Sequence, residues 1–360
     1  MSLCGLPKYF LAANSADGFI NGFSSAFSAK DNWKAYLIKG GPGTGKSSFM
    51  KKIAYFAHSK GMEVELVFCS SDPDSLDGVI LKGKKIIILD ATSPHTLDPV
   101  YPAVCEELLD FGAFWNTKKI EKQREHIIRL TDKNKELHSR ASRMLSAIGQ
   151  LMRNDMKISL IATDIDKVFN FGEKLAKRYL KNKNQGSKEW IRYLGGVTPK
   201  GYVFYGDTID CYCENKIIIC DELYTVSNIL LSVVRDIALS YGYEIITVRN
   251  NFLPREKIEH ILIPEISLAF CTKNCYNNVE ADGVRQIHAQ RFMNRAVIKE
   301  NRGKLVLSRK LINGLINGTV ATLYEAKEMH DRLESYYIKA MDFESLNGLY
   351  SEFVSEILTD

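Results

Sequence analysis

The sequence predicts an α/β protein made of two related halves, each carrying a helical extension. Short apolar runs that read as buried strands alternate with helical periodicity in the first third of the chain, and the same pattern recurs about 181 to 183 residues later. At roughly 150 residues per domain, 360 residues fit two domains. We expect these to span 1–188 and 189–360, with helical extensions at about 116–185 and 306–360.

The composition excludes several classes of protein. The chain has 48 basic and 43 acidic side chains, and a formal charge of only +5 argues against a strongly electrostatic nucleic-acid binder. Eight cysteines in 360 residues are too few for a disulfide scaffold. The chain starts without a basic segment followed by an apolar stretch, and it has no run of about 18 apolar residues. We therefore expect a cytoplasmic protein without a membrane span.

The elements of the first half follow the order strand, helix, strand, loop, strand. Residues 35–39 form a short apolar run, and a helix follows until Gly61, a typical left-handed position after a helix. Further strands are expected at 63–69 and 86–89, with a polar turn at 70–78 between them. This βαβ pattern predicts a parallel sheet whose loops gather at the carboxyl ends of its strands.

Residues 40–47 read GGPGTGKS and match the phosphate-binding pattern GxxxxGK[ST] at every fixed position. Glycines allow backbone N–H groups to turn toward a phosphate, and the N-terminus of the following helix adds a partial positive charge. We expect Lys46 to reach the β- and γ-phosphates and Ser47 to ligate Mg²⁺. The residues expected to bind the nucleotide are Gly40, Gly41, Gly43, Thr44, Gly45, Lys46, Ser47 and Ser48.

Asp90 ends the third apolar strand, where a carboxylate would hold Mg²⁺ directly or through water. The next residue is Ala91, not the glutamate that polarises the attacking water in many ATPases. Thr92 and Ser93 are candidate contacts for the γ-phosphate, and because no NKxD sequence is present, we expect ATP and not GTP. Besides Lys46, the candidate catalytic residues are side chains on loops expected at the same sheet edge, namely Asp72, Asp74, Asp77 and His95.

The second half repeats the first without its phosphate loop. Residues 9–20 align with 192–203, and the strands and helix that follow align at nearly the same offset. In place of GGPGTGKS the second half has DELYTVSN at 221–228, without glycine or lysine and with two acidic residues. We therefore expect one live nucleotide site and a degenerate second copy. At a larger offset, KELHSR at 135–140 also overlays KEMHDR at 327–332.

From about residue 116 the apolar residues recur at heptad spacing, which predicts a long amphipathic helix. A second helical stretch at 164–179 is expected to fold back on it as a hairpin, with an intermolecular coiled coil as the alternative. These extensions are the candidate surface for a protein partner. Basic strings at 118–135 and 174–188 are typical of solvated helix faces, so neither nucleic acid nor a membrane is an expected partner.

Four strings resemble a family of bacterial two-repeat P-loop proteins described as ATPases or nucleotide kinases. They are LIKGGPGTGKSSFMKKIA at 37–54, CSSDPDSLDGVI at 69–80, ILDATSPHTLDPVYP at 88–102 and KEMHDRLESYYI at 327–338. The resemblance covers almost the whole chain and implies tandem P-loop NTPase-like domains that bind ATP. In similar proteins the second half also carries a GxPGTGKS-like loop, which this chain lacks.

These observations predict a slow Mg²⁺-dependent ATPase with one live site in the N-terminal half, in which hydrolysis is coupled to a change between the two halves. One alternative is a small-molecule or nucleotide kinase, in which an aspartate of the 72–77 loop activates an acceptor hydroxyl. Another is a nucleotide-gated binding module with little turnover, whose helices engage a partner.

Overall fold

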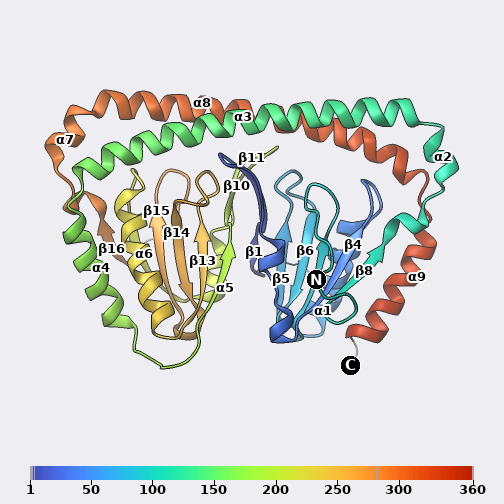
Figure 1. Cartoon of the computed structure of the whole chain (residues 1–360), viewed down its shortest axis with the longest axis horizontal. Helices are drawn as coiled ribbons and strands as arrows, with labels where there is room; N and C mark the ends of the chain where they lie inside the picture. Colours follow the sequence, from blue (N-terminus) through green and yellow to red (C-terminus); the bar gives the residue numbers. More distant parts are fainter. Residues whose placement is uncertain (1–2, 4, 281–282, 359–360) are drawn as a thin grey trace.

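The computed structural model describes residues 3, 5–280 and 283–358 of the chain. Two similar α/β domains lie side by side beneath a pair of long antiparallel helices (Figure 1). The two domains have the same strand order in their main sheets and nearly the same succession of elements along the chain. This similarity indicates an internal duplication and confirms the expectation of two related α/β halves.

The first domain is built from β1 (Lys8–Tyr9), β2 (Ala12–Ser15), β3 (Gly18–Asn21), β4 (Lys34–Lys39), α1 (Lys46–Ser59), β5 (Val64–Phe68), β6 (Leu76–Leu81), β7 (Ile86–Asp90) and β8 (Glu106–Asp110). Its six-stranded sheet has the order β1-β5-β6-β7-β4-β8. Strand β6 runs antiparallel to β5 and β7, and the other pairs are parallel. Strands β2 and β3 form a separate antiparallel hairpin.

The expectation of a wholly parallel sheet with a polar turn over 70–78 is wrong at β6. The turn is shorter, because the backbone N–H of Cys69 already donates to the carbonyl of Ser75 at 3.0 Å. Asp77 and Gly78 interrupt the apolar run of β6, which is why the segment reads as a turn in the sequence. Asp77, expected on a loop, is instead a buried residue of a strand.

The second domain repeats this arrangement with β9 (Lys188–Arg192), β10 (Gly195–Thr198), β11 (Gly201–Phe204), α5 (Asp207–Tyr212), β12 (Asn215–Cys220), α6 (Thr225–Ser240), β13 (Glu244–Arg249), β14 (Ile258–Ile263), β15 (Leu268–Lys273) and β16 (Arg285–His288). Its sheet has the order β16-β12-β15-β14-β13-β9. Strand β14 is the antiparallel member that corresponds to β6. Strands β10 and β11 form the hairpin that corresponds to β2 and β3.

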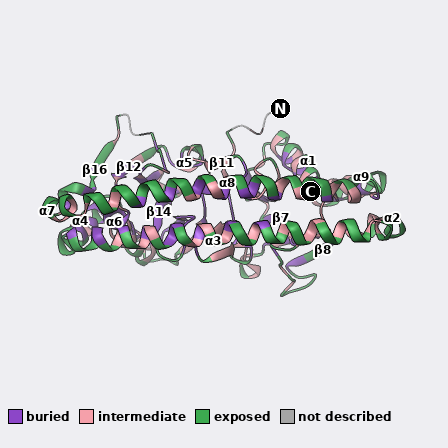
Figure 2. Cartoon of the chain, turned by 90° about the horizontal axis from the view of Figure 1, so that it is seen from above, coloured by how far each residue is buried: buried purple, intermediate pink, exposed green. Residues whose placement is uncertain are grey.

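The helical extensions comprise α2 (Thr117–Glu121), α3 (Arg124–Ala162) and α4 (Ile165–Tyr179) after the first domain, and α7 (Arg295–Glu300), α8 (Arg302–Ile338) and α9 (Phe343–Phe353) after the second. Helices α3 and α8 pack against each other and run over both domains (Figure 1). Seen from above, they lie side by side along the length of the molecule and present exposed residues to the outside (Figure 2). The amphipathic helix expected from residue 116 onward therefore packs within the chain.

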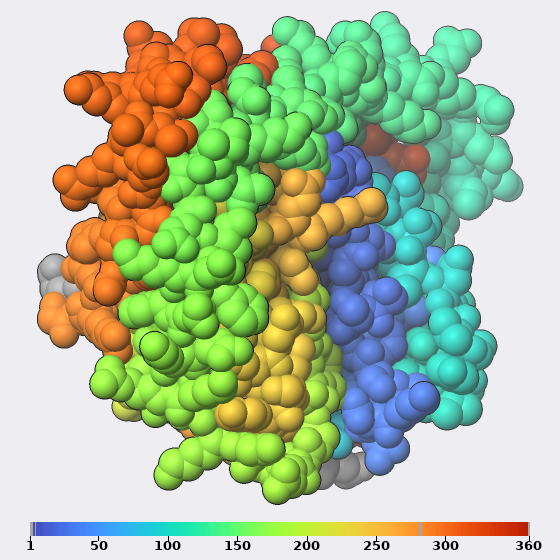
Figure 3. Space-filling model, turned by 60° about the vertical axis from the view of Figure 1, so that its left-hand side comes forward, coloured from blue at the N-terminus to red at the C-terminus, as the bar shows by residue number. Residues whose placement is uncertain are grey.

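Each extension ends against the opposite domain. Val168 and Leu175 of α4 share a buried cluster with Leu230 of α6, and the α4 segment covers one side of the second domain (Figure 3). Phe353 of α9 packs in the same way against Phe49 of α1 in the first domain. The expected hairpin of α4 on α3 is therefore wrong. The physical reason is length, because the 39 residues of α3 carry the chain about 58 Å, at about 1.5 Å per residue, to the other domain.

The helix caps show how the two extensions correspond. Asn116 and Asn294 cap the first helix of each extension, and Asp164 and Asp342 cap the last, with the same separation along the chain in both pairs. KELHSR and KEMHDR lie further apart in the sequence than these pairs of caps. The two strings therefore do not occupy equivalent positions of the two repeats. The two strings instead meet where the antiparallel helices pack, since burial and then the charge of His330 lower the pKa of His138.

The two domains are joined by a common apolar core. One buried cluster includes Leu37 and Val67 of the first sheet together with Ile218 and Ile246 of the second. The backbones of Phe10 and Tyr193 also exchange hydrogen bonds of 2.8 and 3.1 Å across the junction. Among the helices that the structure describes, none combines the length and the apolar character needed to cross a membrane.

Candidate functional site

The loop at 40–47 connects β4 to α1 at the carboxyl edge of the first sheet. Strand β7 pairs with β4 in parallel and places Asp90, its last residue, beside Ile38. Gly43 and Gly45 have φ values of 71° and 83°, which L side chains rarely adopt, so the loop requires glycine at both positions. The predicted phosphate loop and the predicted metal ligand Asp90 therefore occupy the same sheet edge.

Lys46 lies folded over the loop. Its Nζ donates to the carbonyls of Gly40 and Gly41, both at 2.8 Å, and lies 3.5 Å from Oδ2 of Asp90. The Lys46 and Asp90 side chains are only 12% and 15% exposed, so the pair is shielded from water. Thr92, a candidate γ-phosphate contact, donates its hydroxyl to the Gly40 carbonyl at 2.8 Å and its N–H to Asp90 Oδ1 at 2.9 Å.

The other residues of the loop adopt distinct roles. The Thr44 hydroxyl is buried and donates to the carbonyl of Gly41 at 3.0 Å, which stabilises the turn. Ser47 lies in the first turn of α1, where its Oγ accepts from the N–H of Leu76 at 3.0 Å. Ser48, one residue further, is exposed. Ser47 is thus fixed by a backbone donor from the start of β6.

Two of the four candidate proton acceptors, Asp77 and His95, lie together. Nε2 of His95 is 3.3 Å from Oδ2 of Asp77, and the imidazole stacks on Phe23 with ring centroids 5.1 Å apart. Burial raises the pKa of Asp77 to about 6, with opposing influences from His95 and Asp90. The His95 Nδ1 and Asp77 Oδ2 atoms are buried and have no hydrogen-bond partner within the described chain.

Cys69 completes a trio with Asp77 and His95 in which one ligand atom from each lies within 4.8 Å of the others. Thiolate, imidazole and carboxylate are ligand types of zinc, and three protein ligands leave a fourth coordination position open. The same arrangement also suits proton transfer, because a carboxyl group with a pKa of about 6 is largely ionised at neutral pH. No sequence motif predicts that Cys69 lies beside Asp77 and His95, since it is a single cysteine after a strand.

Asp72 and Asp74 lie apart from this trio, in ion pairs with the second half of the chain. Asp72 accepts from the hydroxyl of Ser75 at 2.7 Å and is 3.6 Å from Lys327 of α8. Asp74 is 2.5 Å from Lys200, in the turn between β10 and β11. Both carboxylates therefore link the 70–75 turn to the rest of the molecule, and neither is held against Lys46.

Helix α8 contacts the 40–47 loop directly, which the sequence pattern does not predict. Oε1 of Glu334 accepts from the backbone N–H of Gly43 at 3.2 Å. The hydrogen bond with His330 lowers the pKa of Glu334, and the Gly43 N–H makes a smaller contribution in the same direction. A methyl group on Gly41 would lie 3.1 Å from the ring of Trp115, which packs against Tyr337. The loop is therefore covered by the end of the second half's extension.

Comparisons with protein-family models, with curated proteins and with solved structures each found no match to this chain. The function of the site therefore has to follow from its own geometry.

Replacement of Asp77 by Asn is expected to change the pH dependence of stability. Because the folded-state pKa lies above the unfolded value, the neutral carboxyl group is favoured by folding, and this contribution is lost as the pH rises from about 4 through 6. The difference in free energy of unfolding, wild type minus Asp77→Asn, should therefore decrease from pH 4.5 to pH 7.5 in urea titrations. Exposed Asp98 provides the control, whose Asn variant should show no such trend; an equal trend in both variants would refute the assignment.

Proposed function

We propose that the first half of the chain binds Mg·ATP at the 40–47 loop and hydrolyses it slowly. The observation that carries the proposal is the shielded Lys46–Asp90 pair, 3.5 Å apart, at the junction of a glycine loop and a helix N-terminus. The loop carbonyls that hold Lys46 are weaker partners for its charge than phosphate oxygens are, because the carbonyls are neutral and the phosphate oxygens carry negative charge. Binding of the triphosphate would therefore draw Lys46 away from Gly40 and Gly41.

The residues present fit a magnesium ion. The Ser47 hydroxyl and the Asp90 carboxylate are oxygen ligands of the kind that this hard cation prefers. When bound, Mg²⁺ neutralises charge on the phosphates. Lys46 and the N–H groups of the loop stabilise the remaining negative charge, and Thr92 fixes the loop backbone beside Asp90.

Asp77 is the favoured proton acceptor. Asp77 precedes Gly78, which pairs with Leu89 of β7, so it lies near Asp90, and its raised pKa leaves a basic carboxylate at neutral pH. Nε2 of His95 lies 3.3 Å from Oδ2 of this carboxylate. This arrangement supports transfer of a proton from water, whereas the ion pairs of Asp72 and Asp74 argue against the kinase alternative that uses them.

The second half is proposed to bind no triphosphate through the backbone N–H groups of the equivalent loop. The carboxylate of Asp221 is buried there and accepts from the backbone N–H groups of Leu223 at 3.0 Å and Ser227 at 2.8 Å. A side-chain carboxylate thus already occupies one donor in the first turn of α6, the N–H of Ser227. The charge that would attract a phosphate is neutralised within the chain.

A nucleotide-gated binding module is the second candidate, and the contact of Glu334 with Gly43 favours it. A phosphate that occupies the loop N–H groups must displace this carboxylate, because like charges repel. Glu334 belongs to α8, so its displacement would act on the helix pair that spans both domains. Hydrolysis and gating are distinguished by phosphate release from Mg·ATP without an acceptor: turnover supports the ATPase, and saturable binding with negligible turnover supports the gated module.

Replacement of Glu334 by Gln is expected to tighten Mg·ATP binding by roughly fivefold to tenfold, since removing the negative charge weakens the competing contact with Gly43 and removes the repulsion of phosphate. The measurement is equilibrium titration with a fluorescent ATP analogue. Glu328 of the same helix is exposed, and Glu328→Gln is the matched control that should leave the affinity unchanged. An affinity for Glu334→Gln no tighter than that of the control would contradict the competition.

A further inference from the structure

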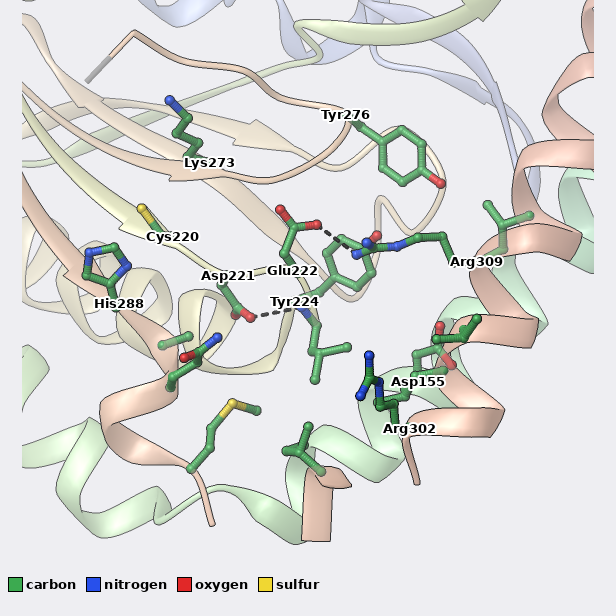
Figure 4. Close-up of a pocket in the computed structure, with 18 of the residues that line it drawn as sticks. Asp155, Cys220, Asp221, Glu222, Tyr224, Lys273, Tyr276, His288, Arg302 and Arg309 are labelled. Carbon is green, nitrogen blue, oxygen red and sulfur yellow. Dashed lines mark hydrogen bonds and ion pairs between the residues drawn. The ribbon is translucent and has the colours of Figure 1, made fainter. Parts of the chain in front are cut away.

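A large groove lies in the second domain, outside the carboxyl edge of its sheet. It has a volume of about 1010 Å³ and is bounded by the ends of β12, β15 and β16, the loop before α6, and helices α7 and α8 (Figure 4). Crevices at the carboxyl ends of parallel strands are a common place for ligands, and pockets for small molecules reach about this size. Cys220, Lys273 and His288 mark the strand ends in the groove wall.

The acidic side chains of the groove already have partners. Glu222 is 3.0 Å from Arg309, and Asp221 accepts the two backbone N–H groups described above (Figure 4). Asp155 accepts from the hydroxyl of Ser308 at 2.7 Å. Three carboxylates thus line the groove together with six cationic side chains, which leaves an excess of positive charge.

Five other cations line the groove and have no carboxylate at ion-pair distance among residues 3, 5–280 and 283–358. They come from the end of β15, from α7 and from the first turns of α8, and are Lys273, Arg295, Lys299, Arg302 and Lys310. Between them lie apolar walls formed by Met293, Ile298 and Val306, and the rings of Tyr224 and Tyr276. The groove thus combines an excess of positive charge with apolar and aromatic surface.

The corresponding region of the first domain is covered by large side chains. At the offset that relates Asn116 to Asn294, Trp115 corresponds to Met293, and Tyr337 corresponds to Ser159. The Trp115 and Tyr337 rings pack together over the phosphate loop, with their centroids 5.5 Å apart. Met293, which lines the groove, fills less space than the tryptophan at the equivalent position of the first domain.

We propose that this groove is a second ligand site, which binds a small organic polyanion. The ligand class is a molecule that carries two or more phosphate or carboxylate charges on an apolar or aromatic body. The unpaired cations hold the charges, and the apolar walls bury the body. The site does not depend on nucleotide binding at Lys46, because it lies on the opposite domain and uses none of the phosphate-loop residues.

The test uses the full chain with the Lys46→Ala substitution, so that the first site contributes no binding. Inorganic tripolyphosphate is titrated calorimetrically as the charge probe. One equivalent should bind, and Lys299→Gln combined with Arg302→Gln should weaken binding at least tenfold. The matched control is Lys122→Gln combined with Arg124→Gln, which removes the same charge from exposed positions at the start of the other long helix and should change the affinity less than twofold.

A second probe tests the apolar part of the groove. The fluorescent dye 8-anilinonaphthalene-1-sulfonate carries an anionic group on an aromatic body, and tripolyphosphate should displace it from the wild-type groove in a competitive manner. Absence of saturable tripolyphosphate binding, or equal weakening in the groove and control variants, would overturn the proposal. Dye that stays bound at saturating tripolyphosphate would show that the cations and the apolar walls do not form one binding pocket.

Discussion

The Lys46→Ala variant is expected to lose at least about 100-fold in Mg·ATP affinity and in the rate of phosphate release. In the proposed site Lys46 would bring a charge to the phosphates from a shielded position, and each charge-assisted hydrogen bond contributes about 1.5–3 kcal/mol. Two such bonds account for the expected factor, since about 1.4 kcal/mol corresponds to tenfold. The measurements are phosphate release and titration with a fluorescent ATP analogue.

Lys60→Ala is the control for this experiment, because Lys60 is an exposed residue at the other end of the same helix. Its binding and turnover should match the wild type. Urea unfolding of both variants shows whether the loss reflects the site or the fold. Wild-type binding and turnover in Lys46→Ala would exclude the 40–47 loop as the nucleotide site.

The Phe353→Ala variant is expected to destabilise the first domain by about 3–5 kcal/mol, the usual cost of removing a buried phenylalanine side chain. Phe353 is 3% exposed and packs edge-on against Tyr36 and Phe49, at centroid distances of 4.8 and 5.6 Å. The residue stands near the end of the chain, whereas its partners stand near the start. The loss of stability in Phe353→Ala therefore measures how strongly the extension of the second half holds the first domain. Urea unfolding provides the free energy of unfolding of each variant.

Tyr324 of α8 is the matched control, since it is an aromatic side chain that is 56% exposed. Tyr324→Ala should cost less than about 1 kcal/mol, as surface substitutions usually do. Equal costs for the two variants would show that α9 does not cover the first domain.

The local structure of each half is largely predictable from the sequence. The apolar run before the glycine loop, the helical spacing after it and the strand that ends at Asp90 are all found in the structure as β4, α1 and β7. The duplication is equally visible, because a nearly constant offset aligns the strands of one half with those of the other. Strand β6 escapes prediction because Asp77 and Gly78 interrupt its apolar pattern, and only pairing with β5 and β7 makes it a strand.

The arrangement of the extensions depends on contacts between distant parts of the chain. Heptad spacing predicts that α3 has an apolar face, yet it does not distinguish α4, α8 or another molecule as the partner. The same limit applies to the candidate site. Lys46 and Asp90 follow from local motifs, whereas the contact of Glu334 with Gly43 arises from the exchange of helices, across 291 residues of sequence.

A crystal structure of the chain with Mg²⁺ and adenosine 5′-(β,γ-imido)triphosphate would show directly whether the 40–47 loop is a nucleotide site. We expect the triphosphate in this loop, with Lys46 on its β- and γ-phosphates, Mg²⁺ held by Ser47 and Asp90, and Glu334 displaced from Gly43. A loop without the analogue, in which Lys46 still donates to the carbonyls of Gly40 and Gly41, would contradict nucleotide binding by the first half.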